Sequence, residues 1–126
     1  MTVVDRESVA VVPWGTGCLA WPMAEADALS VKLEEMPPDA QEVRYRHARA
    51  RQVFFVLAGV LDMEREGVVV RIGPEQALEV PPGVPHQARN GGSAPVRFLV
   101  ISGPTTRGDR EDVASSPGAP AGRTGA

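Results

Sequence analysis

The chain has 126 residues, 43% of them hydrophobic, which suits one domain with one modest core. Its formal net charge of -3 and its pI of about 5.4 argue against a nucleic-acid-binding domain, because such domains usually carry a strong basic excess. The single cysteine, Cys18, excludes an internal disulfide and a cysteine cluster for zinc, which fits a reducing compartment. We find neither the apolar core of a signal peptide nor a run of about eighteen apolar residues, so we expect a cytoplasmic protein that does not span a membrane.

Short apolar runs separated by turn residues make up residues 29–102, and we expect them to be the strands of an all-β domain. Residues 1–28 precede this body as a segment that packs on it. In "ALSVKLEEM", a period of two puts Leu29, Val31 and Leu33 on one face of the first strand. The later runs are "QVFFVLAG", "VLDME", "GVVVRIG", "QALEV" and "PVRFLVIS". Several short strands with regular turn signals indicate a sandwich or a barrel.

The run "QVFFVLAG" is apolar on both faces of its strand and ends in a bend at Ala58–Gly59. Its two faces consist of Val53, Phe55 and Leu57 on one side and Phe54 and Val56 on the other. A strand with one face in water would alternate apolar and polar residues instead. Either the strand lies between two layers, or its outer face forms a subunit interface; we expect the second, with the protein a homodimer.

The last segment, residues 103–126, is small, polar and rich in Gly, Pro and Ser. Such a composition cannot bury enough apolar surface to offset the entropy of ordering the chain. We expect a C-terminal tail that is extended to about Arg110 and disordered from Asp112 onward.

The two histidines of the chain, His47 and His86, occupy informative positions. His86 follows the Pro–Gly turn of "VPPGVPHQARN", which aims the next strand in a defined direction. Tyr45 and His47 lie two residues apart and therefore on one face of a strand, and Gln52 shares a face with Phe54. If the two inner faces meet, the side chains of Tyr45, His47, Gln52 and His86 converge.

These motifs resemble those of the cupin family of small antiparallel jelly-roll β-barrels. The second cupin motif has Pro, Gly, His and Asn at a fixed spacing, and Pro81, Gly83, His86 and Asn90 match it. The first motif is matched by His47, by the apolar strand and by Gly59. The resemblance covers residues 29–102 and implies a single-domain cupin barrel.

The resemblance also implies a metal site, which in cupins is usually three histidines and one glutamate. Here Tyr45 stands for the first histidine and Gln52 for the glutamate, while His47 and His86 match. The expected ligands are thus Tyr45, His47, Gln52 and His86, for a divalent or ferric ion such as Fe, Zn, Mn, Ni or Cu. Gln52 offers only a neutral carbonyl oxygen, and Tyr45 must lose a proton with an ordinary pKa near 10. We therefore expect weak metal binding, and a site without metal is an open alternative.

Three functions remain open from the sequence. The first is a metal-dependent enzyme for a small oxygen-bearing metabolite, of the oxygenase, isomerase or lyase type, with Tyr45, His47 and His86 as catalytic residues. The second is a metal-free acid–base enzyme, in which His47 or His86 transfers the proton and Tyr45 donates a hydrogen bond. The third is a non-catalytic module that binds a sugar or a small acid.

We expect the pocket to bind a small-molecule ligand, and we expect neither a nucleic-acid partner nor a membrane. The expected substrate-binding residues are Arg51, Phe54, Val56 and Phe98. Two strand positions of opposite parity, Arg44 and Arg46, should face away from the pocket. Four carboxylates, Glu34, Glu35, Glu64 and Glu66, are interpreted as solvated charges at strand ends.

Overall fold

The structure is a computed structural model that describes residues 2–114. These residues form eleven β-strands, and among them no helix has the length and hydropathy needed to cross a membrane. The strands are β1 (Val12–Trp14), β2 (Cys18–Glu25), β3 (Ser30–Met36), β4 (Tyr45–His47), β5 (Arg51–Ala58), β6 (Leu61–Arg65), β7 (Val68–Ile72), β8 (Ala77–Val80), β9 (His86–Arg89), β10 (Val96–Gly103) and β11 (Arg110–Asp112). The predicted all-β barrel is confirmed. Asp112, which was expected to be disordered, instead pairs with Tyr45 at the end of β11, and the remainder of the predicted disordered tail from residue 115 lies outside the described residues.

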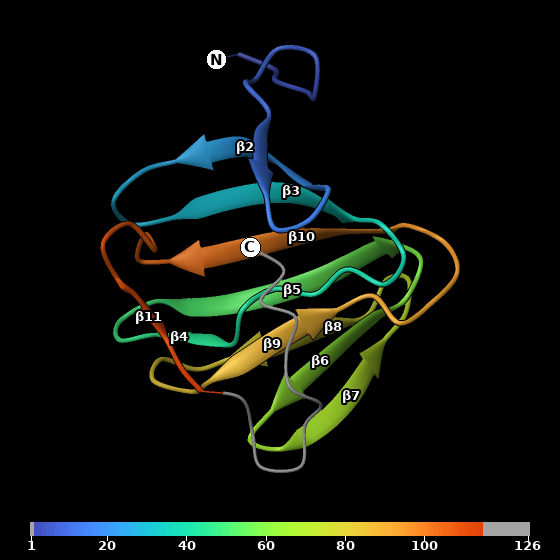
Figure 1. Ribbon diagram of the computed structural model, residues 1–126. Coiled ribbons are helices and arrows are strands. Elements are labelled where there is room, and N and C mark those ends of the chain that lie inside the picture. Colours follow the sequence, from blue (N-terminus) through green and yellow to red (C-terminus); the bar gives the residue numbers. More distant parts are fainter. Residues whose placement is uncertain (1, 115–126) are drawn as a thin grey trace.

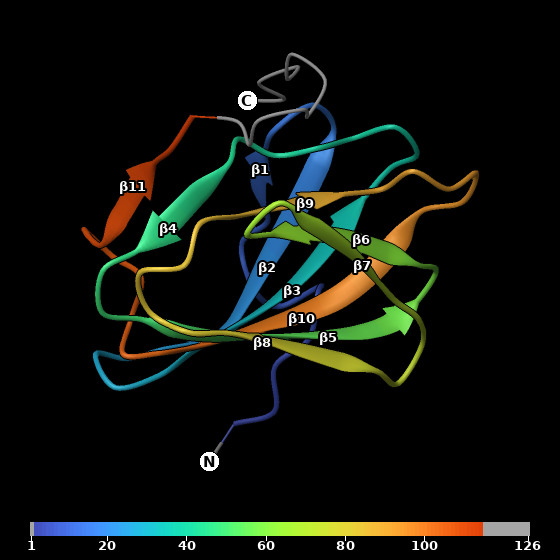
Figure 2. The ribbon, with the colours of Figure 1, turned by 90° about the horizontal axis from the view of Figure 1, so that it is seen from below.

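Two antiparallel sheets face each other across the interior (Figure 1). The six-stranded sheet has the order β1-β2-β3-β10-β5-β8, and the five-stranded sheet has the order β11-β4-β9-β6-β7. Figure 2 shows the space between the two layers, with β4 and β11 along one end of it. The strands that carry the two histidine motifs, β4 and β9, pair with each other in the five-stranded sheet.

The core is built from the inward faces of both sheets. The strand β10 alternates between buried and half-buried residues, so that Phe98 and Val100 face the interior. The antiparallel register sets Phe98 opposite Val56 and Val100 opposite Phe54 on β5. The buried apolar cluster consists of Cys18, Met36, Ala40, Phe54, Val56, Leu61, Met63, Ile72, Val80, Ala88, Val96, Phe98 and Val100.

A bend follows β5 at Gly59, as the sequence predicts. Gly59 has a φ of 79°, in the left-handed region that favours glycine. A Cβ atom at this position would lie 2.5 Å from the carbonyl oxygen of Pro95. This close approach of two backbone segments joins the end of β5 to the start of β10, and it explains why glycine is needed here.

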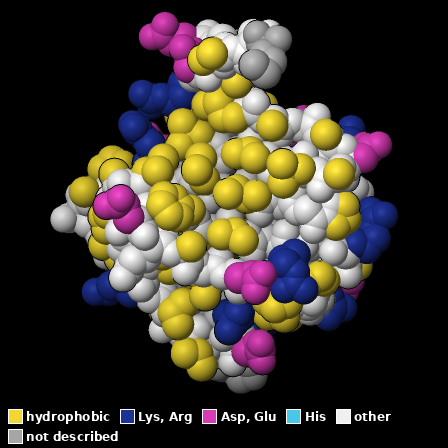
Figure 3. Space-filling model, turned by 180° about the vertical axis from the view of Figure 1, so that it is seen from behind, with side chains coloured by type: hydrophobic (Ala, Val, Ile, Leu, Met, Phe, Trp, Pro, Cys, Tyr) yellow, Lys and Arg dark blue, Asp and Glu magenta, His cyan; other side chains and the backbone are white. Residues whose placement is uncertain are grey.

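The outer face of the six-stranded sheet is also apolar. Cross-strand neighbours form two continuous rows on it, Leu33–Leu99–Phe55 and Val31–Ile101–Val53. Seen from behind, hydrophobic side chains gather over this face (Figure 3). The prediction that the β5 strand is apolar on both faces is thus confirmed, and two neighbouring strands share this property.

Candidate functional site

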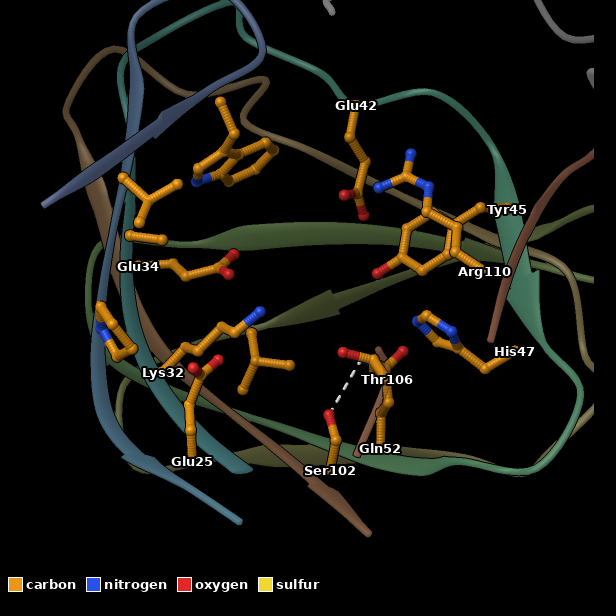
Figure 4. A pocket seen from close by; sticks show the side chains of 15 residues that line it. Glu25, Lys32, Glu34, Glu42, Tyr45, His47, Gln52, Ser102, Thr106 and Arg110 are labelled. Atoms are coloured by element: carbon orange, nitrogen blue, oxygen red, sulfur yellow. Dashed lines mark hydrogen bonds between the residues drawn. The ribbon is translucent and has the colours of Figure 1, made fainter. Parts of the chain in front are cut away.

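A cavity of about 420 Å³ opens between the two sheets, near β4 and β11 (Figure 4). Its size lies within the range of about 300–1,000 Å³ that is usual for small-molecule sites. Its walls are formed by Val12, Trp14, Ala20, Pro22, Glu25, Lys32, Glu34, Glu42, Tyr45, His47, Gln52, Val100, Ser102, Thr106 and Arg110. Three of the four expected metal ligands, Tyr45, His47 and Gln52, are among them.

The four expected ligands come together although they belong to three different strands. Tyr45 on β4 lies opposite His86 on β9, and their ring centroids are 4.4 Å apart. The ring centroids of Tyr45 and His47 are 5.1 Å apart. His86 is only 1% exposed and lies behind Tyr45 and Gln52 rather than on the cavity wall. One end of the cavity therefore carries the His47 imidazole and the Gln52 amide, and the His86 imidazole contacts this amide from the protein interior.

The ring of His86 has a defined orientation. Its Nδ1 lies 3.0 Å from the carbonyl oxygen of Val84, so Nδ1 carries the proton that this carbonyl accepts. Burial lowers the pKa of His86 to about 4, so the ring is neutral near pH 7 and Nε2 keeps a lone pair. This Nε2 lies 3.1 Å from Oε1 of Gln52, whose Nε2 donates to the hydroxyl of Ser102 at 3.2 Å.

His47 is 6% exposed, and its Nδ1 has no hydrogen-bond partner among the described residues. Burial lowers the pKa of His47, and the backbone carbonyl of Asp109 acts in the opposite direction. Buried polar atoms without a partner are uncommon in folded proteins. The neutral ring of His47 therefore lies on the cavity wall (Figure 4), while its unpartnered Nδ1 is enclosed by the protein.

Tyr45 is held as a neutral phenol. Burial raises its pKa well above the ordinary value of 10, and the carboxylates of Glu42 and Glu34 raise it further. The guanidinium of Arg110 lies over the Tyr45 ring, 4.2 Å from its centroid, and lowers the pKa by a smaller amount. This environment favours Tyr45 as a hydrogen-bond donor and disfavours the phenolate that a metal would bind.

Three carboxyl groups that were not expected at the site from the sequence line the cavity, those of Glu25, Glu34 and Glu42, and two of them have a raised pKa. Burial raises the pKa of Glu34 to about 7, and burial together with the Glu34 charge raises the pKa of Glu42 to about 8. Glu42 is 8% exposed, and its Oε1 accepts a hydrogen bond from the Ala88 backbone at 3.2 Å. The two side chains point into the cavity from different sides (Figure 4).

The prediction that Glu34 and Glu64 are solvated is wrong. Glu64 is 2% exposed and forms an ion pair with Arg44 at 2.5 Å, while Glu34 is half-buried on the cavity wall. Strand parity puts Glu34 on one face with Met36 and on the opposite face from Leu33, but the apolar Val31 and Leu33 favoured burial of the other face, so the sequence did not identify Glu34. Likewise, no signal marked Glu42, which lies outside the regular strands.

The C-terminal segment supplies two further wall residues, Thr106 and Arg110. Arg110 on β11 pairs in register with His47 on β4. The carboxylate of Asp109 accepts hydrogen bonds from the backbone N–H groups of Arg49 and Ala50, at 3.0 and 2.9 Å. These bonds lower the pKa of Asp109 against the opposing effect of burial, and they tie the segment to the β4–β5 turn.

The four expected substrate-binding residues lie elsewhere. Arg51 is exposed and pairs with Glu79 at 3.3 Å, and Phe54, Val56 and Phe98 belong to the closed core. None of the four is on the cavity wall. Their role in substrate binding stays a prediction that this placement does not support.

The donor set fits a metal ion only in part. Among residues 2–114, no group of three or more His, Cys, Asp or Glu side chains could hold an ion. The remaining donors are two neutral imidazoles and the Gln52 carbonyl, which suit borderline ions such as Zn, Fe, Ni or Cu. Without a carboxylate among the donors, such a site binds a divalent ion weakly.

Comparison with solved structures shows similar folds at low identity. KdgF from Halomonas sp. matches with a TM-score of 0.77 and 18% identity, over 85% of this chain and 98% of that one. The polyketide cyclase RemF from Streptomyces resistomycificus matches with a TM-score of 0.77 and 22% identity, over 92% and 87% of the two chains. A cupin-superfamily sugar phosphate isomerase from Silicibacter pomeroyi matches with a TM-score of 0.71 and 20% identity, over 82% and 76%.

No curated protein sequence matches the chain. Residues 32–102, however, match the family model described as the Cupin domain. This match covers more than half of the 126 residues, and it contains both histidine motifs. The two-sheet architecture agrees with it, and the chain belongs to the cupin family.

Proposed function

We propose that the protein is an enzyme for a small oxygen-bearing metabolite, and that His47, Gln52 and His86 hold a divalent metal ion at one end of its cavity. One observation carries the proposal: two neutral imidazoles meet the Gln52 amide beside a cavity of about 420 Å³, and the His47 ring has a buried nitrogen without a partner. A neutral, desolvated imidazole is the form in which histidine binds a metal.

The orientation of His86 supports this proposal. The carbonyl of Val84 holds the proton on Nδ1, which leaves the Nε2 lone pair directed at the Gln52 side chain. A second-sphere carbonyl commonly fixes metal-binding histidines in this way. Nε2 and Oε1 are 3.1 Å apart and both present lone pairs, so they cannot share a hydrogen bond but can bind one cation.

A metal ion bound there would supply Lewis-acid polarisation of a substrate oxygen. The other tasks belong to the side chains of the cavity. The neutral hydroxyl of Tyr45 can donate a hydrogen bond to a substrate oxygen. The carboxyl of Glu42, with a pKa of about 8, can hold or release a proton near neutral pH. This combination favours proton-transfer chemistry, as in an isomerisation or an elimination, over oxygenation.

The test is the metal content of protein purified without a chelator and without a nickel column. We expect bound divalent metal in the wild type and its loss in His86→Ala, with Arg51→Ala, an exposed residue outside the cavity, as the control that keeps it. An unchanged metal content in a folded His86→Ala variant would overturn the proposal, as would a wild type that binds no zinc in a titration.

A second candidate is a metal-free acid–base enzyme, and one observation favours it. If the Gln52 amide is turned by 180°, it donates to His86 Nε2 and accepts from the Ser102 hydroxyl, so every partner is satisfied without a cation. His47 would then act as the base and Tyr45 as the donor. Activity that survives EDTA but is lost in His47→Ala would select this candidate, and a ligand recovered unchanged would point to a binding module instead.

We also propose that the outer face of the six-stranded sheet joins two copies of the chain. The rows Leu33–Leu99–Phe55 and Val31–Ile101–Val53 make a broad apolar surface, and soluble monomers rarely expose large continuous patches of this kind. An ion pair between Arg97 and Glu35 lies at one edge of it, as is usual for the rim of an interface. The interface leaves the cavity, which opens between the sheets, accessible.

A further inference from the structure

The strand β3 has the reverse of the usual binary pattern. Lys32 and Glu34 point inward to the cavity, whereas Val31 and Leu33 point outward. In a β-barrel, inward positions are normally apolar and outward positions polar. A local departure from this rule that the fold does not require is expected at functional positions.

The two charged side chains are inserted into apolar rows. Glu34 lies between Ala20 on β2 and Phe98 on β10, and Lys32 lies between Pro22 and Val100. Both are half-buried, and neither forms an ion pair or a hydrogen bond with another of the residues 2–114. The charges of Lys32 and Arg110 favour the ionised form of Glu34, but burial opposes it more strongly, and a partly buried charge without a hydrogen bond costs stability. Lys32 and Glu34 therefore lower the stability of the fold, and their presence is better explained by a role in the cavity.

Apolar side chains form much of the wall around these charges, which also includes the exposed residue Glu25 on β2. Val12 and Trp14 come from β1, Pro22 from β2 and Val100 from β10. The β2–β3 ladder has an irregularity between Pro22 and Ala24, and such bulges redirect side chains next to binding sites. The indole Nε1 of Trp14 is buried without a partner, so this wall also contains one free hydrogen-bond donor.

From this arrangement we infer a specificity subsite at the end of the cavity away from the histidines. It holds the apolar ring of a substrate against Val12, Trp14 and Val100, and it binds an oxygen substituent of that ring between Lys32 and Glu34. The substrate class is a small cyclic compound with a hydroxyl or carbonyl group, rather than a fully hydroxylated sugar. This inference rests on the proposed function only in placing the reaction at the other end, at His47 (Figure 4).

The chemistry of Lys32 and Glu34 explains the preference for a cyclic compound with one oxygen substituent over a sugar. The Lys32 ammonium donates to a carbonyl, hydroxyl or phenolate oxygen, and Glu34, whose pKa of about 7 makes it a carboxylate above neutral pH, accepts from a hydroxyl. Both charges are held away from bulk water, which strengthens their hydrogen bonds to a ligand. A sugar would place several further hydroxyls against Val12, Val100 and the face of Trp14, where they would lose their hydrogen bonds to water.

The experiment measures binding of 1-naphthol to the full chain by calorimetry, with D-glucose as the polyol probe. We expect saturable binding of one 1-naphthol per chain and no measurable binding of glucose. The affinity for 1-naphthol should fall at least about tenfold in Glu34→Gln and in Lys32→Met, because each loses a charged hydrogen bond. The matched control is Glu35→Gln, the next residue on the outer face, which pairs with Arg97 and should leave the affinity unchanged.

Two results would overturn the inference: preferential binding of glucose, or a loss of affinity in Glu34→Gln no larger than in Glu35→Gln. Thermal unfolding of each variant shows that it is folded, and Glu34→Gln should be at least as stable as the wild type because it removes a half-buried charge. The variant His47→Ala separates the two proposals. If the subsite is correct, His47→Ala binds 1-naphthol within about twofold of the wild type, whether or not it has lost its metal.

Discussion

Replacing Gly59 by alanine should destabilise the fold far more than the same change at Gly67. The two glycines have nearly the same backbone conformation, with φ of 79° and 83°. An L-residue in this region costs about 1–2 kcal/mol, and both variants should lose this amount. At Gly67 a Cβ atom meets nothing within 4 Å, whereas at Gly59 it meets the Pro95 oxygen at 2.5 Å and Val96 Cα at 2.9 Å.

Relieving that contact means separating two backbone segments, which as an overpacking effect costs about 1–3 kcal/mol more. We therefore expect a total loss of about 2–5 kcal/mol for Gly59→Ala, a large part of the roughly 5–15 kcal/mol that stabilises a domain. Urea unfolding followed by circular dichroism measures both variants, with the free energy of unfolding taken from the midpoint and slope. Equal losses for Gly59→Ala and Gly67→Ala would show that the contact with Pro95 is not what requires glycine.

Three further predictions concern the cavity and the outer face. Burial raises the pKa of Glu42 from 4.5 to about 8, so the folded state binds a proton that the unfolded state has lost, and the free energy of unfolding should fall as pH rises from 6.5 to 8. Urea unfolding of Glu42→Gln should show a flatter dependence on pH, and an unchanged dependence would contradict this prediction. Tyr45→His adds a third imidazole and should tighten zinc binding on the order of tenfold by titration, while unchanged affinity would place residue 45 outside the ligand set. Light scattering should show a monomer for Leu99→Glu and a dimer for the control Val69→Glu, whose residue lies on the exposed strand β7. A wild type that is monomeric at high concentration would refute the interface.

Most of the fold could be predicted from local sequence patterns. The apolar runs, the turn at Pro81–Gly83 and the bend at Gly59 predicted an all-β barrel, and each depends on nearest neighbours along the chain. The spacing of the two histidine motifs pointed to the cupin family, which the family match shows. Strand parity also brought Tyr45 and His47 to one face, where both line the cavity.

Which wall of the cavity each residue joins depended on the tertiary structure. Apolar composition suggested that Phe54, Val56 and Phe98 line the pocket, yet these side chains fill the closed core between the sheets. The charged residues Glu34 and Glu42 took the cavity wall instead, where burial raises the pKa of both. Composition cannot make this distinction, because the same inward parity serves both the packed and the open part of a barrel.

By itself, therefore, the sequence determined the strands, their turns and the pair of histidines, because these follow from backbone preferences and from a period of two. Only the tertiary structure decided the protonation states and the partners of the site. A carboxyl group becomes a proton donor near neutral pH, and an imidazole stays neutral, through desolvation and through charges that other strands bring within reach. The inward orientation of the Lys32 and Glu34 side chains was likewise decided by the tertiary structure, because it depends on which face of β3 the opposite sheet covers.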